Sequence, residues 1–154
     1  MRSATPKVLH ALAGRSMLGH ALAAAAWLEP GRLAVVVRHQ RDRVAAHALE
    51  IDPSVLVVDQ DEVPGTGRAV QCALTALDAA AHAAAVAQQT EHSAAQPEIH
   101  ALTALPDMLD GPVVVLAGDI PLLDGGTLAE LLDAHVSEGN AVTVLTTEVA
   151  DPTG

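Results

Sequence analysis

The chain of 154 residues is long enough for one domain with a real core, because half of its residues are hydrophobic. Its 19 acidic residues against 8 basic ones give a net charge of −11, which argues against nucleic acid as a partner. A single cysteine, Cys72, excludes an intrachain disulfide and a cysteine metal cluster. No leader opens the chain and no apolar run approaches the roughly 20 residues that span a bilayer, so we expect a cytoplasmic protein without membrane insertion.

The first fourteen residues are typical of a loop, in which Pro6 sets the turn before Lys7. Lys7 is the chain's one lysine, and a lysine in such a loop is usually solvated. A helix is expected after Gly14, with Ser16 as its N-cap and an end before Pro30. Its expected apolar face consists of Leu18, Leu22, Ala25, Ala26 and Trp27.

Residues 33–37 then predict a short buried strand, residues 41–50 an amphipathic helix, and residues 55–58 the next strand. Helix and strand alternate in this part of the chain. That alternation is typical of an α/β fold with a parallel sheet and right-handed crossovers.

Gln60 follows the second strand, and Gly65, Thr66 and Gly67 form a small-residue turn that opens a helix. Glycines let a backbone come close to a flat ligand, and glutamine can both donate to and accept from a base edge. The alternative is an ordinary turn, because a G-T-G triplet alone is weak evidence.

The helix that begins at Arg68 is expected to run to about residue 77 and to continue into an insertion at about residues 78–105, rich in Ala, His and Gln. The pentapeptide A-L-T-A-L occurs at residues 73–77 and again at 101–105, which suggests a local duplication. A metal site could be imagined there, but the spacing fits no zinc pattern, and solvated surface is the better interpretation. The side chains concerned are His82, His92, His100, Glu91 and Glu98.

Residues 112–123, P-V-V-V-L-A-G-D-I-P-L-L, are the strongest candidate for chemistry. Residues 113–117 are apolar or small between Gly-Pro and Gly-Asp, which predicts a strand buried on both faces of a parallel sheet. Asp119 would follow the strand's carboxyl end, where a carboxylate can hold a divalent cation that bridges phosphate oxygens. The alternative is an aspartate that only caps the next turn. Beyond it we expect a helix capped by Thr127 and ended by Gly139, and a strand over residues 141–149.

Four stretches in one order, residues 5–18, 60–70, 113–123 and 142–154, resemble the pyrophosphorylase domain of the bacterial bifunctional N-acetylglucosamine-1-phosphate uridylyltransferase and glucosamine-1-phosphate acetyltransferase family. The combination of P-K-V-L, G-T-G and G-D-x-P-L is far more specific than any one motif. The resemblance implies a Rossmann-like nucleotide-diphosphosugar transferase fold with a mostly parallel sheet. It also implies that N-acetylglucosamine 1-phosphate attacks the α-phosphorus of UTP, releasing pyrophosphate and forming UDP-N-acetylglucosamine for peptidoglycan and cell-envelope synthesis.

The resemblance also implies roles for the residues that match the family's motifs. Lys7 would contact phosphate as a catalytic residue, and Asp119 would bind Mg²⁺. The implied nucleotide-binding positions are Lys7, Gln60, Gly65, Thr66 and Gly118. Of these, Gln60, Gly65 and Thr66 would read uracil.

The chain also departs from the family. The family's first strand and phosphate loop would precede Met1, and its later sugar-binding residues, second metal ligand and acetyltransferase domain would follow Gly154. That first strand lies centrally in the family's sheet, between the strands matching residues 33–37 and 113–117. Each buried group left unpaired without it would cost about 1–3 kcal/mol. We therefore expect residues 1–154 to be a partial pyrophosphorylase domain that is inactive or nearly so.

Two alternatives stay open from the sequence. The first is a nucleotidyltransferase of the same fold that uses another sugar phosphate or molybdopterin. The second is a non-catalytic remnant or interaction domain whose exposed sheet centre is covered in a homo-oligomer.

Overall fold

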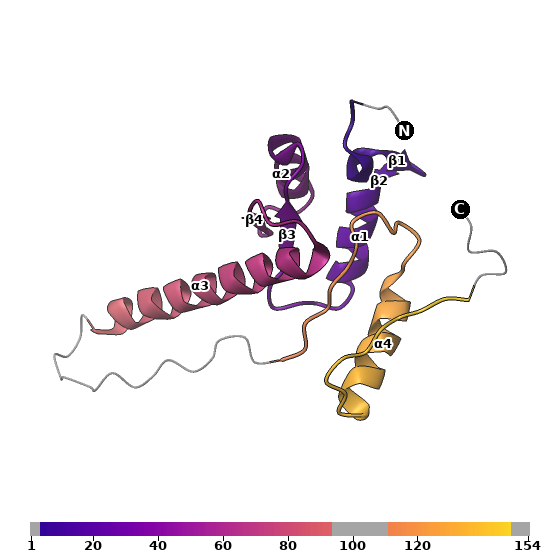
Figure 1. Ribbon diagram of the computed structural model, residues 1–154. Coiled ribbons are helices and arrows are strands. Elements are labelled where there is room, and N and C mark those ends of the chain that lie inside the picture. Colours follow the sequence, from indigo (N-terminus) through magenta and orange to yellow (C-terminus); the bar gives the residue numbers. More distant parts are fainter. Residues whose placement is uncertain (1–3, 94–110, 149–154) are drawn as a thin grey trace.

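The computed structural model describes residues 4–93 and 111–148 (Figure 1). A 3₁₀ helix, η1 (Lys7–Leu9), is followed by a hairpin of β1 (Ala11–Leu12) and β2 (Arg15–Ser16). Its two turn residues, Ala13 and Gly14, have φ of 51° and 82°, the left-handed pair that a type I′ turn requires. The expectation of a plain loop up to Gly14 is therefore wrong, because this turn pairs the flanking residues.

The predicted alternation of helices and strands is confirmed in the next segment, which comprises α1 (Met17–Ala26), β3 (Ala34–Val37), α2 (Arg41–Ile51) and β4 (Leu56–Asp59). Strands β3 and β4 pair in parallel, with Ala34 opposite Leu56 and Val37 opposite Asp59. The Ser16 N-cap is also confirmed, since its hydroxyl accepts from the Gly19 N–H at 2.9 Å. A parallel pair with a helical crossover is the elementary unit of the expected α/β fold.

The core lies between α1, α2 and β3, and it is built from aliphatic side chains of moderate size. Helices α2 and α3 (Thr66–Ser93) both pack against both strands and lie on either side of them in Figure 1. The buried cluster consists of Leu18, Leu22, Val35, Val37, Val44, Ala48 and Val55.

Helix α3 continues well past residue 77, through the first part of the segment interpreted as an insertion. Residues 94–110, which contain His100 and Glu98, lie outside the described residues. By length and composition alone, the stretch Thr66–Ala87 could cross a membrane, so the expectation that no apolar run approaches that length is wrong. A single helix of this kind is weak evidence, because a core helix of a soluble protein or a signal sequence passes the same test.

Helix α4 (Gly125–Ser137) lies where a helix was expected, but Thr127 is not its N-cap. Asp124 takes that place, and its carboxylate accepts from the Thr127 N–H at 2.9 Å. Gly139, with φ of 64°, follows the last turn, and Asn140 N–H donates to the His135 carbonyl at 3.1 Å. These contacts close the helix as a Schellman motif, which requires a left-handed residue at the position of Gly139.

The two strands predicted on either side of α4 are not formed within the described part of the chain. Residues 113–117 and 141–148 belong to no strand there, and Val113, Val114 and Val115 are exposed. The described strands supply no partner for them: β3 pairs with β4, and a groove lies between β3 and residues 113–116. An apolar run becomes a buried strand only where a neighbouring strand supplies backbone partners.

Trp27 also departs from its expected position on the buried face of α1. It caps the C-terminal end of α1 and is 71% exposed, while its ring packs on the backbone of α4. A Cβ atom added at Gly125 would lie 2.2 Å from Trp27 Cγ. Glycine at this position therefore allows the close approach of α1 and α4.

Candidate functional site

Gln60 is held at the carboxyl end of β4. Its backbone N–H donates to the Val37 carbonyl at 2.9 Å and extends the ladder by one bond beyond the strand. Its side-chain Nε2 donates to the carbonyls of Val63 at 3.0 Å and Gly65 at 2.9 Å. Because both amide protons are used in the loop, the side chain keeps Oε1 as its acceptor.

Gly65 and Thr66 form the junction between this loop and α3. Gly65 has φ of 121°, a conformation that side chains rarely adopt, and its carbonyl accepts from the Ala69 N–H in the first turn of the helix. Thr66 is the first residue of α3. The first N–H groups of a helix lack intrahelical partners, so this junction presents donors of the kind that bind anions.

Two ion pairs on either side of Gln60 hold the loop in place. Arg41 Nε donates to Asp59 Oδ1 at 2.9 Å, and Arg68 Nε donates to Asp61 Oδ2 at 2.8 Å. Each arginine's hydrogen bond is the main reason that the pKa of its carboxyl partner is lowered. These two pairs were not predicted from the sequence. An arginine seven residues after an aspartate, across a glycine turn, is the signal that could have indicated the second.

Lys7 and Asp119 are brought together from 112 residues apart, and Lys7 Nζ donates to Asp119 Oδ2 at 2.6 Å. The Lys7 side chain is 68% exposed and that of Asp119 is 38% exposed, so both remain accessible from solvent. The hydrogen bond from Lys7 is the main cause that lowers the pKa of Asp119, with burial acting in the opposite direction. Asp119 therefore stays ionised through the neutral range.

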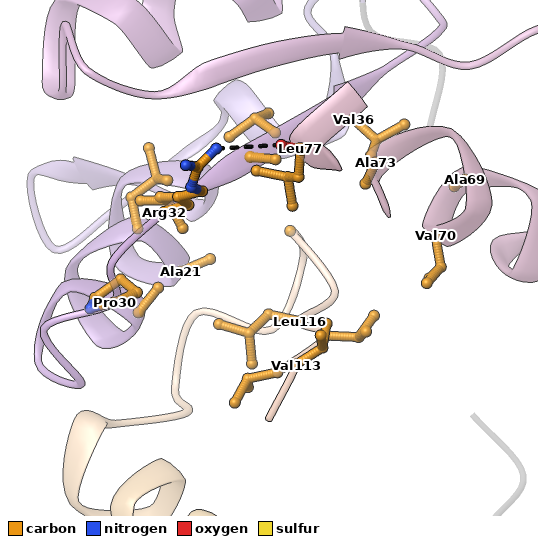
Figure 2. A pocket seen from close by; sticks show the side chains of 18 of the residues that line it. Ala21, Pro30, Arg32, Val36, Ala69, Val70, Ala73, Leu77, Val113 and Leu116 are labelled. Atoms are coloured by element: carbon orange, nitrogen blue, oxygen red, sulfur yellow. Dashed lines mark hydrogen bonds between the residues drawn. The ribbon is translucent and has the colours of Figure 1, made fainter. Parts of the chain in front are cut away.

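Gly118 and Thr66 both line a groove of about 760 Å³ between β3, α1, α3 and the segment 111–118. Figure 2 shows Val113 and Leu116 on one side of this groove, opposite Val36, Val70 and Ala73. The walls are mostly aliphatic, and Arg32 lies at one end, where Nη1 donates to the Leu77 carbonyl at 3.2 Å. The groove interior does not suit phosphate, whereas its Gly118 edge adjoins Asp119.

The six predicted site residues thus fall into groups. Hydrogen bonds join Lys7 to Asp119 and Gln60 to Gly65, and the groove is lined by both Thr66 and Gly118. The bonds of the described residues place the phosphate and metal candidates in one cluster and the base candidates in another.

The donor set at Asp119 suits Mg²⁺ better than metals that need a protein cage. The described residues contain no group of three or more His, Cys, Asp or Glu side chains that could hold a metal. Mg²⁺ keeps several waters and is usually bound by one or two carboxylates together with substrate phosphates. Asp119 supplies one ionised, accessible carboxylate, as that mode of binding requires.

Comparison with known proteins shows the family to which the chain belongs. Residues 1–152 match the MobA-like NTP transferase domain, and the chain belongs to that family. The whole chain aligns with the bifunctional protein GlmU of Pseudarthrobacter chlorophenolicus at 53% identity, of Paenarthrobacter aurescens at 51% and of Streptomyces avermitilis at 47%. In each case all of this chain covers 26% of the relative, so it spans about a quarter of their length.

Proposed function

We propose that this chain is part of a uridylyltransferase that makes UDP-N-acetylglucosamine from UTP and N-acetylglucosamine 1-phosphate. The observation that carries the proposal is the Lys7–Asp119 contact, a lysine and a carboxylate joined at 2.6 Å beside a glycine in a member of the NTP transferase family. The 53% identity to a bifunctional protein GlmU over the whole chain supports the same reaction.

In this proposal, Asp119 holds Mg²⁺ and Lys7 contacts the triphosphate. Mg²⁺, when bound, neutralises charge on the phosphate oxygens. Lys7 adds a positive charge from η1, where the Leu9 N–H donates to the Pro6 carbonyl at 3.0 Å. Because phosphoryl transfer needs mainly in-line positioning and charge neutralisation, two such groups are the minimum for this end of the site.

The base end of the proposed site consists of Gln60, Gly65 and Thr66. With both Nε2 protons used by the loop, Gln60 Oε1 accepts from the imide N–H of uracil, whereas cytosine has no such donor. In this proposal Gly118 lets the ligand approach the backbone closely. Its protein neighbours leave room for a side chain, because an added Cβ atom would meet Val8 at 3.5 Å and Leu18 at 3.9 Å. Packing therefore does not demand a glycine at this position.

The test is turnover in a protein of the relatives' length that contains this segment, measured as pyrophosphate release with N-acetylglucosamine 1-phosphate and Mg²⁺. UTP should be used at least tenfold better than CTP. Asp119→Asn should lower kcat/KM by two orders of magnitude or more. Equal turnover with CTP, or an Asp119→Asn enzyme of normal activity, would reject the assignment. Guanine also has an imide N–H from which Gln60 Oε1 could accept. A preference for GTP would therefore favour the alternative, a nucleotidyltransferase of the same fold that uses molybdopterin.

A further inference from the structure

The Lys7–Asp119 contact has a second consequence, which concerns the order in which ligands bind. Lys7 Nζ lies 2.6 Å from Asp119 Oδ2, in the space from which a cation would approach that oxygen. A protonated lysine has three donors and no lone pair, so it competes with a metal ion for a carboxylate and cannot share the ion as a ligand. The ammonium also repels any second cation at this carboxylate.

Lys7 has the reach and freedom to leave this position. Its side chain is 68% exposed, and an exposed ion pair of this kind is weak enough to exchange with solvent and salt. In the described part of the chain, the ion pair of Asp119 is with Lys7, whereas Asp59 and Asp61 are paired with Arg41 and Arg68. The competition is therefore confined to one carboxylate.

We propose that Lys7 occupies the cation position on Asp119 in the free protein, so that a divalent ion binds there well only when triphosphate draws Lys7 away. This inference rests on the proposed function, because it takes Asp119 as the metal ligand and Lys7 as the phosphate contact. It adds an order of events: free metal binds weakly, and metal together with nucleotide binds tightly. Lys7 thereby couples occupation of the metal site to occupation of the phosphate site.

The first experiment measures Mn²⁺ binding to the 154-residue chain by electron paramagnetic resonance, without nucleotide. Lys7→Met should tighten binding by up to about fivefold, the factor that corresponds to about 1 kcal/mol for an exposed ion pair. Lys7→Arg keeps the ion pair and should bind as the wild type does. The matched control is Arg41→Met, which frees Asp59 from a comparable pair and should give no gain. Circular dichroism of each variant checks that its helices are retained.

The outcomes separate the two proposals. Suppose that Lys7→Met and the wild type bind Mn²⁺ equally, and that adding Asp119→Asn weakens Mn²⁺ binding in each of them. Asp119 is then a metal ligand, but the competition does not exist. If Asp119→Asn has no effect on Mn²⁺ binding, even combined with Lys7→Met, the metal role of Asp119 and the competition both fail. An equal gain in Arg41→Met would mean that any freed carboxylate binds Mn²⁺, which also overturns the inference.

The second experiment uses the fact that the chain has one lysine, so ¹⁵N-lysine labelling gives a single side-chain ammonium signal. Mg²⁺ alone, at concentrations that leave the Mn²⁺ site mostly empty, should shift this signal little. Mg²⁺ with UTP should shift it strongly, away from its position in the free protein. A full shift with Mg²⁺ alone would contradict the proposed order.

Discussion

The valine run of β3 and the valine run at residues 113–115 have nearly the same sequence but different structures. Val35 and Val37 are buried, and β3 pairs in parallel with β4, whereas Val113 and Val115 are each 55% exposed and belong to no strand in the described part of the chain. Composition cannot explain the difference. A strand next to β3 provides backbone partners on one side, while residues 113–116 face the groove.

The comparison indicates how this fold is held together. The unit of α1, α2, β3 and β4 contains the buried cluster, and α4 adds one fully buried large side chain, Leu128. Burial of apolar area is the main source of stability, so the two parts should respond differently to the same substitution. The first part is the unit up to β4 and the loop after it, and the second is the segment 111–148 with α4. The proposed site uses both parts, because Gln60 comes from the first and Asp119 from the second.

The largest expected effect comes from a matched pair of leucines, one from each part. Leu22→Ala in the core should lower the free energy of unfolding by about 2–5 kcal/mol, because it leaves a cavity among packed side chains. Leu122→Ala, at a side chain that is 84% exposed, should change it by less than about 0.5 kcal/mol. Urea denaturation of both variants measures the difference. Equal losses would mean that Leu122 is buried in solution and that the second part is more tightly packed than described.

The contact of α1 with α4 can be broken at Gly125. Gly125→Ala should cost about 1–3 kcal/mol, because the new methyl group would overlap the Trp27 ring and force the helices apart. Trp27 is the chain's one tryptophan, so its fluorescence should shift to longer wavelength as the contact opens. Gly31→Ala is the control, since a Cβ atom at Gly31 meets nothing within 4 Å. An unchanged emission maximum in Gly125→Ala would show that the two helices are not in contact.

A smaller effect is expected at the two helix caps. Ser16→Ala and Asp124→Ala each remove the acceptor of an N-cap hydrogen bond, at a typical cost of about 1 kcal/mol. Ser16 Oγ also lies 2.7 Å from His47 Nε2 and thereby links α1 to α2, so its loss should cost more. Thermal unfolding of both variants, with Ser16→Thr as the control that keeps a hydroxyl, measures the order. A larger loss in Asp124→Ala would reverse the inferred ranking of the two parts.

The sequence predicted what local patterns determine. The alternation over residues 16–58, the Ser16 cap and the helix after Pro121 follow from capping, apolar period and turn residues, which act within a few positions. The cap of α4 was misplaced by three residues, because Asp124 and Thr127 are both good caps and local pattern does not rank them. The Ala13-Gly14 turn was missed because alanine rarely adopts positive φ.

The features that the sequence did not predict depend on contacts between residues far apart in the chain. The run at residues 113–117 predicts a strand, but strand formation depends on a partner that the run itself does not specify. The Lys7–Asp119 contact spans 112 positions and could be anticipated only from the resemblance, which placed both residues in one site. Periodicity could not indicate that the lysine would contact the carboxylate directly.

The smallest expected effect is a change in the pKa of Asp119, whose ion pair with Lys7 connects the two parts. The pKa of Asp119 is lowered mainly by its hydrogen bond with Lys7, so Lys7→Met should raise it toward the usual value of about 3.9. The sign follows from linkage: the pair stabilises the fold above that unfolded-state pKa, and its contribution is lost as the pH falls through the lower folded-state pKa. Carboxyl ¹³C titration between pH 6 and pH 2 measures the shift. Asp124 is the internal control, because its pKa is lowered mainly by the Thr127 N–H and should be the same in both proteins. An Asp119 titration that Lys7→Met leaves unchanged would mean that the ion pair does not persist in solution, and the two parts would then lack a charged link at the proposed site.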